Sequence, residues 1–239
     1  FALKGGTAIN LFVRDMPRLS VDLDLVFADH ALPRERALAS IQKAMREAAQ
    51  RLTRRGFAVH IPEADVGETK LLVRRDRIEV KVEANFVMRE MGFEVARKHA
   101  GTVLPVRRAS FTTVARDQLL ADVEIPVVSL QDMYGGKLCA ALDRQHPRDL
   151  FDVMQLYGNE GITPGIRRAF VVYLCCGKRP IHELLFPQLR DIRRDYTNNF
   201  KGMTAEPVAL EVLVAVRERL VRQIQQELDG SERRFLLSL

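Results

Sequence analysis

Two aspartates near the start of the chain, Asp22 and Asp24, have the type and spacing of residues that do chemistry. Alternate residues of a strand share a face, so both carboxylates are expected to project the same way from a predicted strand over residues 20–25. Neighbouring carboxylates repel each other unless a cation lies between them, and Mg²⁺ prefers such hard oxygen ligands. The pair therefore predicts a Mg²⁺ site, which Mn²⁺ would also suit, although an Asp-x-Asp alone is more often a solvated strand face.

A glycine pair, Gly5-Gly6, precedes the aspartates by about one helix, which is predicted to begin near Thr7 and to end at Asp15-Met16-Pro17. Glycine has no Cβ, so backbone N–H groups at the start of a helix can point at phosphate oxygens. Such a pair alone is more often a turn. Followed in this order by two carboxylates, it predicts a site for the triphosphate of an NTP substrate.

The elements that must hold these residues alternate between strands and helices up to about residue 128. Apolar residues recur at helical spacing over residues 33–55, and Gly56 is expected to end that helix. Strands are predicted at residues 1–3, 57–61, 69–74, 77–86 and 111–114. The expected fold is α/β (α+β), a mixed sheet flanked by helices in a catalytic domain over residues 1–126.

Beyond Pro126 the pattern becomes helical, and a helical C-terminal domain is predicted over residues 127–239. Ser129 has the position of an N-cap for a helix through residue 142. Gly135-Gly136 within that helix indicates a close backbone or ligand approach, or a break. Further helices are predicted at residues 147–156, 166–176 and 207–229, the last closed by Gly230.

A third carboxylate would complete a two-metal site, and the alternating strand over residues 77–86 offers Glu79 and Glu83. Both are expected on its polar face together with Lys81, opposite Ile78, Val80 and Val82. The alternative is a half-solvated sheet face on which Lys81 balances the two glutamates. From the residues alone, either glutamate is a candidate.

Three blocks in order resemble the AbiEii/AbiGii toxin group of the nucleotidyltransferase superfamily, which includes the mycobacterial MenT toxins. The first is Lys4-Gly5-Gly6-Thr7-Ala8 with Arg18-Leu19-Ser20-Val21-Asp22-Leu23-Asp24-Leu25, the second is Ile78-Glu79-Val80-Lys81-Val82-Glu83, and the third is Lys137-Leu138-Cys139-Ala140-Ala141-Leu142 with Arg148-Asp149-Leu150-Phe151-Asp152. They span residues 4–152, and no motif follows.

The resemblance implies nucleotidyl transfer from an NTP to RNA, with a tRNA 3′ end as the expected acceptor, toxicity through blocked translation, and a separate antitoxin, often a DNA-binding winged-helix protein. It favours Glu83 over Glu79, as a third metal ligand beside Asp22 and Asp24 or as the base. Lys137 is implied to neutralise the departing pyrophosphate. The implied nucleotide-binding residues are Lys4, Gly5, Gly6, Thr7, Ser20, Lys137 and Arg148.

Asp149 and Asp152 are spaced i, i+3 and share a helical face after Arg148. They are predicted, with Lys81, to support the site from outside its first ligands, the aspartates by anchoring Lys137 and Arg148. The alternative is an acidic first turn that complements the helix dipole. Arg148 has the further alternative of contacting nucleotide phosphate itself.

Composition points to an acidic partner and a reducing compartment. Lys and Arg number 37 against 31 Asp and Glu, a net charge of +6, which favours nucleic acid. Three cysteines without metal-ligand spacing suit the cytoplasm, and no apolar run reaches a membrane span. The first residue is Phe1, so residues of the native N-terminus are expected to be missing.

Two other functions fit the same residues. One is a kinase-like phosphotransferase on the same fold, and the other is a non-catalytic module that binds nucleotide or RNA. A P-loop ATPase is disfavoured because the Gly-x4-Gly-Lys-Ser/Thr pattern is absent from the sequence. The oligomeric state, the base of the NTP and the RNA sequence are not predicted.

Overall fold

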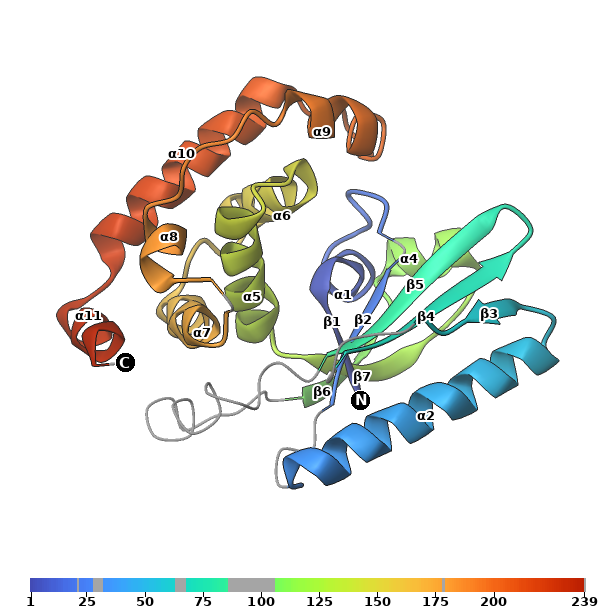
Figure 1. Ribbon diagram of the computed structural model, residues 1–239. Helices are drawn as coiled ribbons and strands as arrows, with labels where there is room; N and C mark the ends of the chain where they lie inside the picture. The colour runs from blue at the N-terminus through green and yellow to red at the C-terminus, as the bar shows by residue number, and fades with distance from the viewer. Residues whose placement is uncertain (21, 28–31, 63–67, 86–105, 178, 239) are drawn as a thin grey trace. The chain divides into compact units, whose positions relative to one another are not determined.

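The computed structural model describes residues 1–20, 22–27, 32–62, 68–85, 106–177 and 179–238 (Figure 1). The described residues fall into two compact units. The first contains those up to residue 128 except Pro17–Leu19, and the second contains Pro17–Leu19 and those from residue 129 onward. Whether the units are separate domains, with the predicted boundary at 126/127, stays a prediction.

The described part of the first unit forms a seven-stranded sheet with the order β3-β4-β5-β2-β1-β7-β6. β2 pairs with β5, and β1 with β7, in parallel, whereas the other neighbours are antiparallel, so the sheet is mixed as predicted. The strands are β1 (Ala2–Lys4), β2 (Leu23–Val26), β3 (Ala58–His60), β4 (Glu68–Arg75), β5 (Ile78–Asn85), β6 (Val106–Ser110) and β7 (Glu124–Val128).

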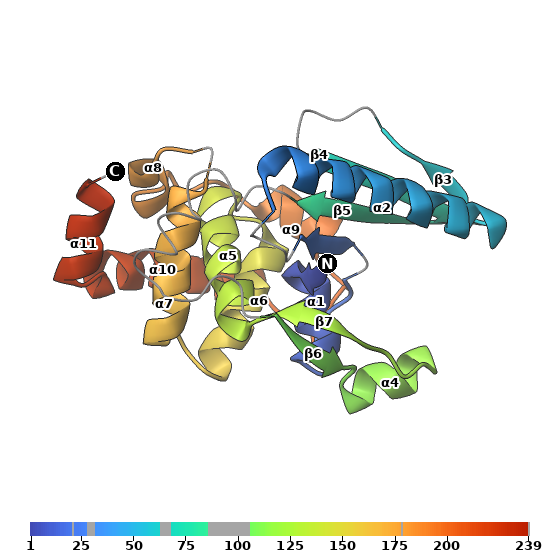
Figure 2. The ribbon, with the colours of Figure 1, turned by 90° about the horizontal axis from the view of Figure 1, so that it is seen from below.

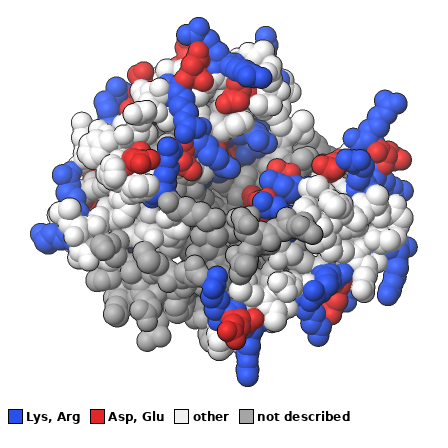
Figure 3. Space-filling model, viewed as in Figure 1, with Lys and Arg blue, Asp and Glu red and all other residues white. Residues whose placement is uncertain are grey.

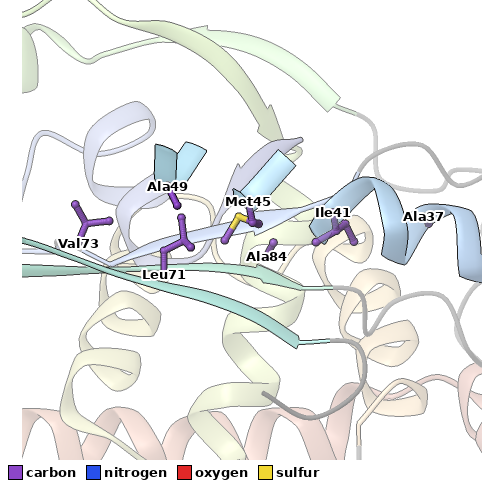
Figure 4. Close-up of a cluster of buried hydrophobic side chains, with 7 residues drawn as sticks. All are labelled: Ala37, Ile41, Met45, Ala49, Leu71, Val73 and Ala84. Carbon is purple, nitrogen blue, oxygen red and sulfur yellow. The ribbon is translucent and has the colours of Figure 1, made fainter. Parts of the chain in front are cut away.

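Helix α2 (Arg34–Arg54) lies along β3 and β4 and covers this part of the sheet (Figure 2). Its predicted apolar stripe is confirmed, because Ile41, Met45 and Ala49 are buried against Leu71 and Val73 of β4 (Figure 4). Burial of a side chain as large as Ile41, Met45 or Leu71 contributes about 1.5–3 kcal/mol to folding. The helix ends before Gly56, whose φ of +84° belongs to the left-handed region that favours glycine.

Two short helices complete the described part of the first unit. α1 (Gly5–Phe12) follows β1 directly, and α4 (Thr113–Leu119) precedes β7. The predicted strand over residues 111–114 is wrong, because the Thr112 side chain accepts a hydrogen bond from the Ala115 N–H and caps α4. β6 and β7 were not predicted, since their charged and proline residues obscure the alternation.

The second unit is helical in its described part, as predicted. Its helices are α5 (Leu130–Asp143), α6 (Pro147–Gly158), α7 (Pro164–Cys175), α8 (Ile181–Leu185), α9 (Arg193–Asn199), α10 (Leu210–Glu227) and α11 (Gly230–Leu237). Ser129 caps α5 through Asp132 N–H, as expected. Gly230 does not close the long helix, because α10 ends at Glu227 and Asp229 caps α11 in a capping box.

The glycines of α5 serve close packing against α7. A Cβ at Gly135 would lie 2.8 Å from the Ala169 Cβ, and one at Gly136 would lie 3.0 Å from Cε1 of Tyr173. Close backbone approach, rather than a break in the helix, therefore accounts for Gly135. Among the described residues, no helix combines the length and the apolar character needed to cross a membrane.

Candidate active site

Four charged residues of the first unit lie in register across four neighbouring strands. Lys70 of β4 pairs with Glu83 of β5, Glu83 with Asp24 of β2, and Asp24 with Lys4 of β1. Residues paired in register on adjacent strands share a face of the sheet. The sheet therefore carries one row of charges, positive at its two ends and negative in the middle.

Asp22 and Lys81 add a further carboxylate and a further lysine to this group of charges. β2 begins at Leu23, so Asp24 lies on the strand as predicted, whereas Asp22 lies one residue before it. The Lys81 Nζ is 3.3 Å from Glu83 Oε1 and 4.0 Å from Asp22 Oδ2, and Lys70 Nζ is 3.5 Å from Glu83 Oε1. The lysines thus reduce the repulsion among the carboxylates.

The start of α1 holds Asp24 against Gly5. Gly5 has a φ of +75°, and a Cβ added there would overlap Oδ2 of Asp24. The absence of a side chain at Gly5 therefore lets the Asp24 carboxylate reach the first turn of the helix. The side chain of Lys4, the N-cap residue of α1, makes no capping hydrogen bond. N–H groups at the start of a helix can bind an anion.

Thr7 ties this turn to the segment before β2. Its Oγ1 donates a hydrogen bond to the Asp22 carbonyl oxygen and lies 3.1 Å from Oγ of Ser20. Asn10, also buried, donates from Nδ2 to the Gly6 carbonyl at 2.8 Å. These contacts fix the glycine turn, Ser20 and Asp22 relative to one another.

A second group of charges is buried within the second unit. Lys137 Nζ of α5 lies 2.9 Å from Asp149 Oδ1 and 3.0 Å from Asp152 Oδ2, both on α6. Arg18 donates from Nε and Nη2 to the two oxygens of Asp152, each at 2.7 Å. Arg144 reaches Asp149 from the surface at 2.9 Å.

The pKa values of this cluster show that its ion pairs outweigh burial. Burial alone lowers the pKa of Lys137, but Asp149 and Asp152 more than offset it, and the pKa lies above its ordinary value. Burial also raises the pKa of Asp149, but Lys137 and Arg144 outweigh it and the pKa lies below 3.8. Both groups are therefore charged at neutral pH.

A family model described as nucleotidyl transferase AbiEii toxin, type IV toxin–antitoxin system, matches residues 1–229. The chain belongs to the AbiEii family. Membership implies a cognate antitoxin as partner. A comparison with curated proteins found no match.

Among solved structures, the AbiEii-family chain is similar to MenT4, a nucleotidyltransferase toxin from Mycobacterium tuberculosis H37Rv. The TM-score is 0.66 at 22% identity, and the match covers 98% of this chain and 78% of MenT4. At this identity the likeness shows the fold, which is that of a MenT nucleotidyltransferase toxin.

The predicted site residues of this AbiEii-family chain divide between the two units. In the first, the structure brings together Gly5 with Asp24, Thr7 with Ser20 and Asp22, and Lys81 with Asp22 and Glu83. It does not gather three carboxylates, because no group of three ligating side chains suited to a metal ion occurs among the described residues. Glu83 as third metal ligand or base stays a prediction.

In the second unit, Lys137 is held by Asp149 and Asp152, which is the anchoring arrangement the spacing suggested. Asp149 also lies in the first turn of α6, so the alternative of an acidic residue that complements the helix dipole describes it as well. Arg148 is only partly buried, and its side chain makes no hydrogen bond or ion pair with a described residue.

Three residues of these clusters were missed from the sequence as site residues. Lys70 pairs with Glu83 only because β4 and β5 meet in this register, which the sequence alone does not give. Arg144 follows the end of α5 and looks like a surface residue. Arg18 had a signal, its place in the Arg-x-Ser-x-Asp block, yet its partner Asp152 is 134 residues away.

The decrease in the free energy of unfolding at low pH is expected to depend on Asp149. Because its folded-state pKa is depressed, its contribution is present above the ordinary Asp pKa of 3.8 and is lost as the pH falls through the folded value. Urea unfolding at pH 7, 5, 4 and 3 should therefore show a steep loss below pH 4 that Asp149→Asn flattens. The exposed Asp117→Asn should leave the slope unchanged, and equal slopes for wild type and Asp149→Asn would contradict the assignment.

Proposed function

We propose that this AbiEii-family toxin transfers a nucleoside monophosphate from an NTP to an RNA acceptor, the 3′ end of tRNA, and thereby blocks translation. The observation that carries the proposal is the contact of Asp24 with Gly5 at the start of α1. This contact puts a carboxylate beside N–H groups that can bind phosphate. Nucleotidyl transfer needs these two features together.

Mg²⁺ fits the donor set of this turn. Asp22 and Asp24 offer carboxylate oxygens, the space left by Gly5 admits the Asp24 oxygen, and Mg²⁺ commonly binds one or two carboxylates plus substrate phosphates. In the proposal, Asp22 and Asp24 hold the ion, and Mn²⁺ is a substitute. When bound, the metal supplies activation of the acceptor hydroxyl and neutralisation of phosphate charge.

The chain's own groups bind and orient the substrates. The N–H groups of Gly5, Gly6 and Thr7 are proposed to hold the triphosphate, with Lys4 and Ser20 beside them. Thr7 keeps the Asp22 segment in place through its hydrogen bond to the Asp22 carbonyl oxygen. Glu83 is proposed as the base or a further metal ligand, and Lys70 and Lys81 lie beside it.

Lys137 and Arg148 are proposed to bind phosphate oxygens and to neutralise the departing pyrophosphate. The raised pKa of Lys137, which Asp149 and Asp152 cause against the effect of burial, keeps it protonated for this role. An RNA acceptor and the three free cysteines fit a cytoplasmic protein.

Transfer of label tests the proposal. The purified protein is incubated with Mg²⁺, total tRNA and each α-labelled NTP in turn, beside the Asp22→Asn/Asp24→Asn variant. Label on tRNA with the wild type alone supports nucleotidyl transfer and names the base. Label from γ-labelled ATP or GTP instead would indicate the phosphotransferase, and full toxicity of the double variant would indicate a binding module.

Gly5→Ala is expected to lower transfer by about a hundredfold, because displacing Asp24 by even 1 Å misplaces a reacting centre. The matched control is Gly56→Ala, where φ is +84° but no atom lies within 4 Å of an added Cβ. It should lose about 1 kcal/mol of stability from its backbone conformation and keep full activity. Equal activity of the two variants would contradict the role given to Gly5.

A further inference from the structure

A polar cavity of about 540 Å³ lies within the second unit and is lined by residues of α8 and of the segment that follows it. It takes no part in the chemistry described above. Its lining includes Gln145, Arg179, Glu183, Phe186, Gln188 and Arg190.

Gln145 fixes the wall of this cavity. It is 2% exposed, its Nε2 donates to the Gln188 carbonyl at 2.7 Å, and its Oε1 accepts from the Arg190 N–H at 3.0 Å. Both groups belong to the segment that passes alongside α10. The wall is therefore held by a buried side chain and does not depend on exposed contacts.

Arg217 of α10 places a positive charge directly behind the wall. It is 6% exposed, and its Nη1 donates to Gln145 Oε1 at 3.0 Å and to the Arg190 carbonyl at 2.6 Å. Among the described residues no carboxylate forms an ion pair with it, and its buried Nε has no hydrogen-bond partner. Burial lowers its pKa and outweighs the opposing attraction of the Glu218 and Asp191 carboxylates.

The lining adds further positive charge and an aromatic face. Arg179 is balanced by Asp143 and Glu183 at 2.6 and 3.1 Å, whereas the exposed Arg190 side chain makes no ion pair or hydrogen bond with a described residue. Phe186 is 68% exposed. On the face shown in Figure 3, acidic and basic side chains are interspersed.

We propose that this cavity binds a single-stranded segment of the RNA acceptor, with a backbone phosphate at Arg190 in front of the buried Arg217 and a base stacked on Phe186. Neither Arg190 nor Arg217 forms an ion pair with a described residue, so a bound anion would give both a partner. An exposed aromatic ring beside a basic groove is the common platform for unpaired bases. The inference rests on the proposed function only in taking RNA as the acceptor.

Binding of a short, fluorescein-labelled, mixed-sequence single-stranded oligoribonucleotide, followed by anisotropy without NTP, tests the proposal. Arg190→Ala should weaken binding about tenfold and reduce the slope of log K against log salt by roughly 0.7, the value for one lost phosphate contact. Phe186→Ala should weaken binding about tenfold with an unchanged slope, because stacking releases no counter-ions. Arg194→Ala, which removes an exposed arginine outside the lining, should bind as the wild type does.

Wild-type affinity and salt slope in both Arg190→Ala and Phe186→Ala would overturn the proposal. Both side chains are exposed, so the variants should fold, and unchanged thermal unfolding verifies this. The assay contains no NTP, so its outcome is independent of transfer. If the two variants weaken RNA binding as expected but no label is transferred, only the proposed function is refuted. If label is transferred but the variants bind as the wild type does, only the proposed RNA-binding role of the cavity is refuted.

Discussion

Replacing Asp24 with Asn should lower nucleotide transfer by roughly a thousandfold, because a metal ion bound to the reacting phosphoryl group stabilises the transition state by several kcal/mol. Asp24 lies in the middle of the charge row of the sheet and against Gly5 at the start of α1. Asparagine keeps the shape of the side chain but removes the negative charge. The loss should therefore appear in kcat, measured as the rate at which label from the α-phosphate of the NTP is transferred to RNA.

Asp117→Asn is the matched control, because it removes an exposed carboxylate of α4 in the same unit. It should keep wild-type activity, and both variants should unfold within a few degrees of the wild type. Asp22→Asn should also lower transfer strongly. Retention of more than a tenth of the activity by Asp24→Asn would contradict the metal-binding role given to it.

Arg18→Met should reduce the free energy of unfolding by about 3 kcal/mol, the lower end for removing one partner of a buried ion pair. Arg18 and Asp152 have side chains 3% and 1% exposed, joined by two hydrogen bonds of 2.7 Å. The loss stays near the lower end because Lys137 still compensates Asp152. Urea denaturation measures it.

An exposed pair gives the comparison. Arg74 and Glu79 lie 2.8 Å apart with side chains 63% and 41% exposed, so Arg74→Met should change stability by less than about 1 kcal/mol. The double variant Arg18→Met/Asp152→Leu should recover part of the loss, because it also removes Asp152, the buried charge that loses Arg18 as its partner. Equal effects of Arg18→Met and Arg74→Met would refute a structural role for the buried pair.

The fold was predictable where local pattern and tertiary contact agree. The stripe of α2, the cap at Ser129 and the glycine turn that starts α1 all follow from side-chain chemistry within a few residues. The failures lie where a short polar segment takes its structure from a neighbour. β6 and β7 pair with each other although their sequences lack clean alternation, and Thr112 caps a helix where β-branched residues suggested a strand.

The candidate site was predictable as a set of residues but not as an arrangement. Asp24 and Gly5 could be named from type and spacing, whereas their contact depends on the pairing of β1 with β2. The ion pairs of Glu83 with Lys70 and Lys81 depend on the register of β4 against β5. Register and long-range contacts such as Arg18 with Asp152 arise from the packed structure, and short-range pattern does not encode them.

The mass of the RNA product tests the central claim most directly. tRNA incubated with the protein, Mg²⁺ and unlabelled NTPs should gain the mass of one or more whole nucleotides at its 3′ end, and Asp24→Asn should leave the mass unchanged. Nucleotide addition means attack at the α-phosphate with loss of pyrophosphate. A gain of a single phosphate, or an unchanged mass with the folded wild-type protein, would contradict nucleotidyl transfer to tRNA.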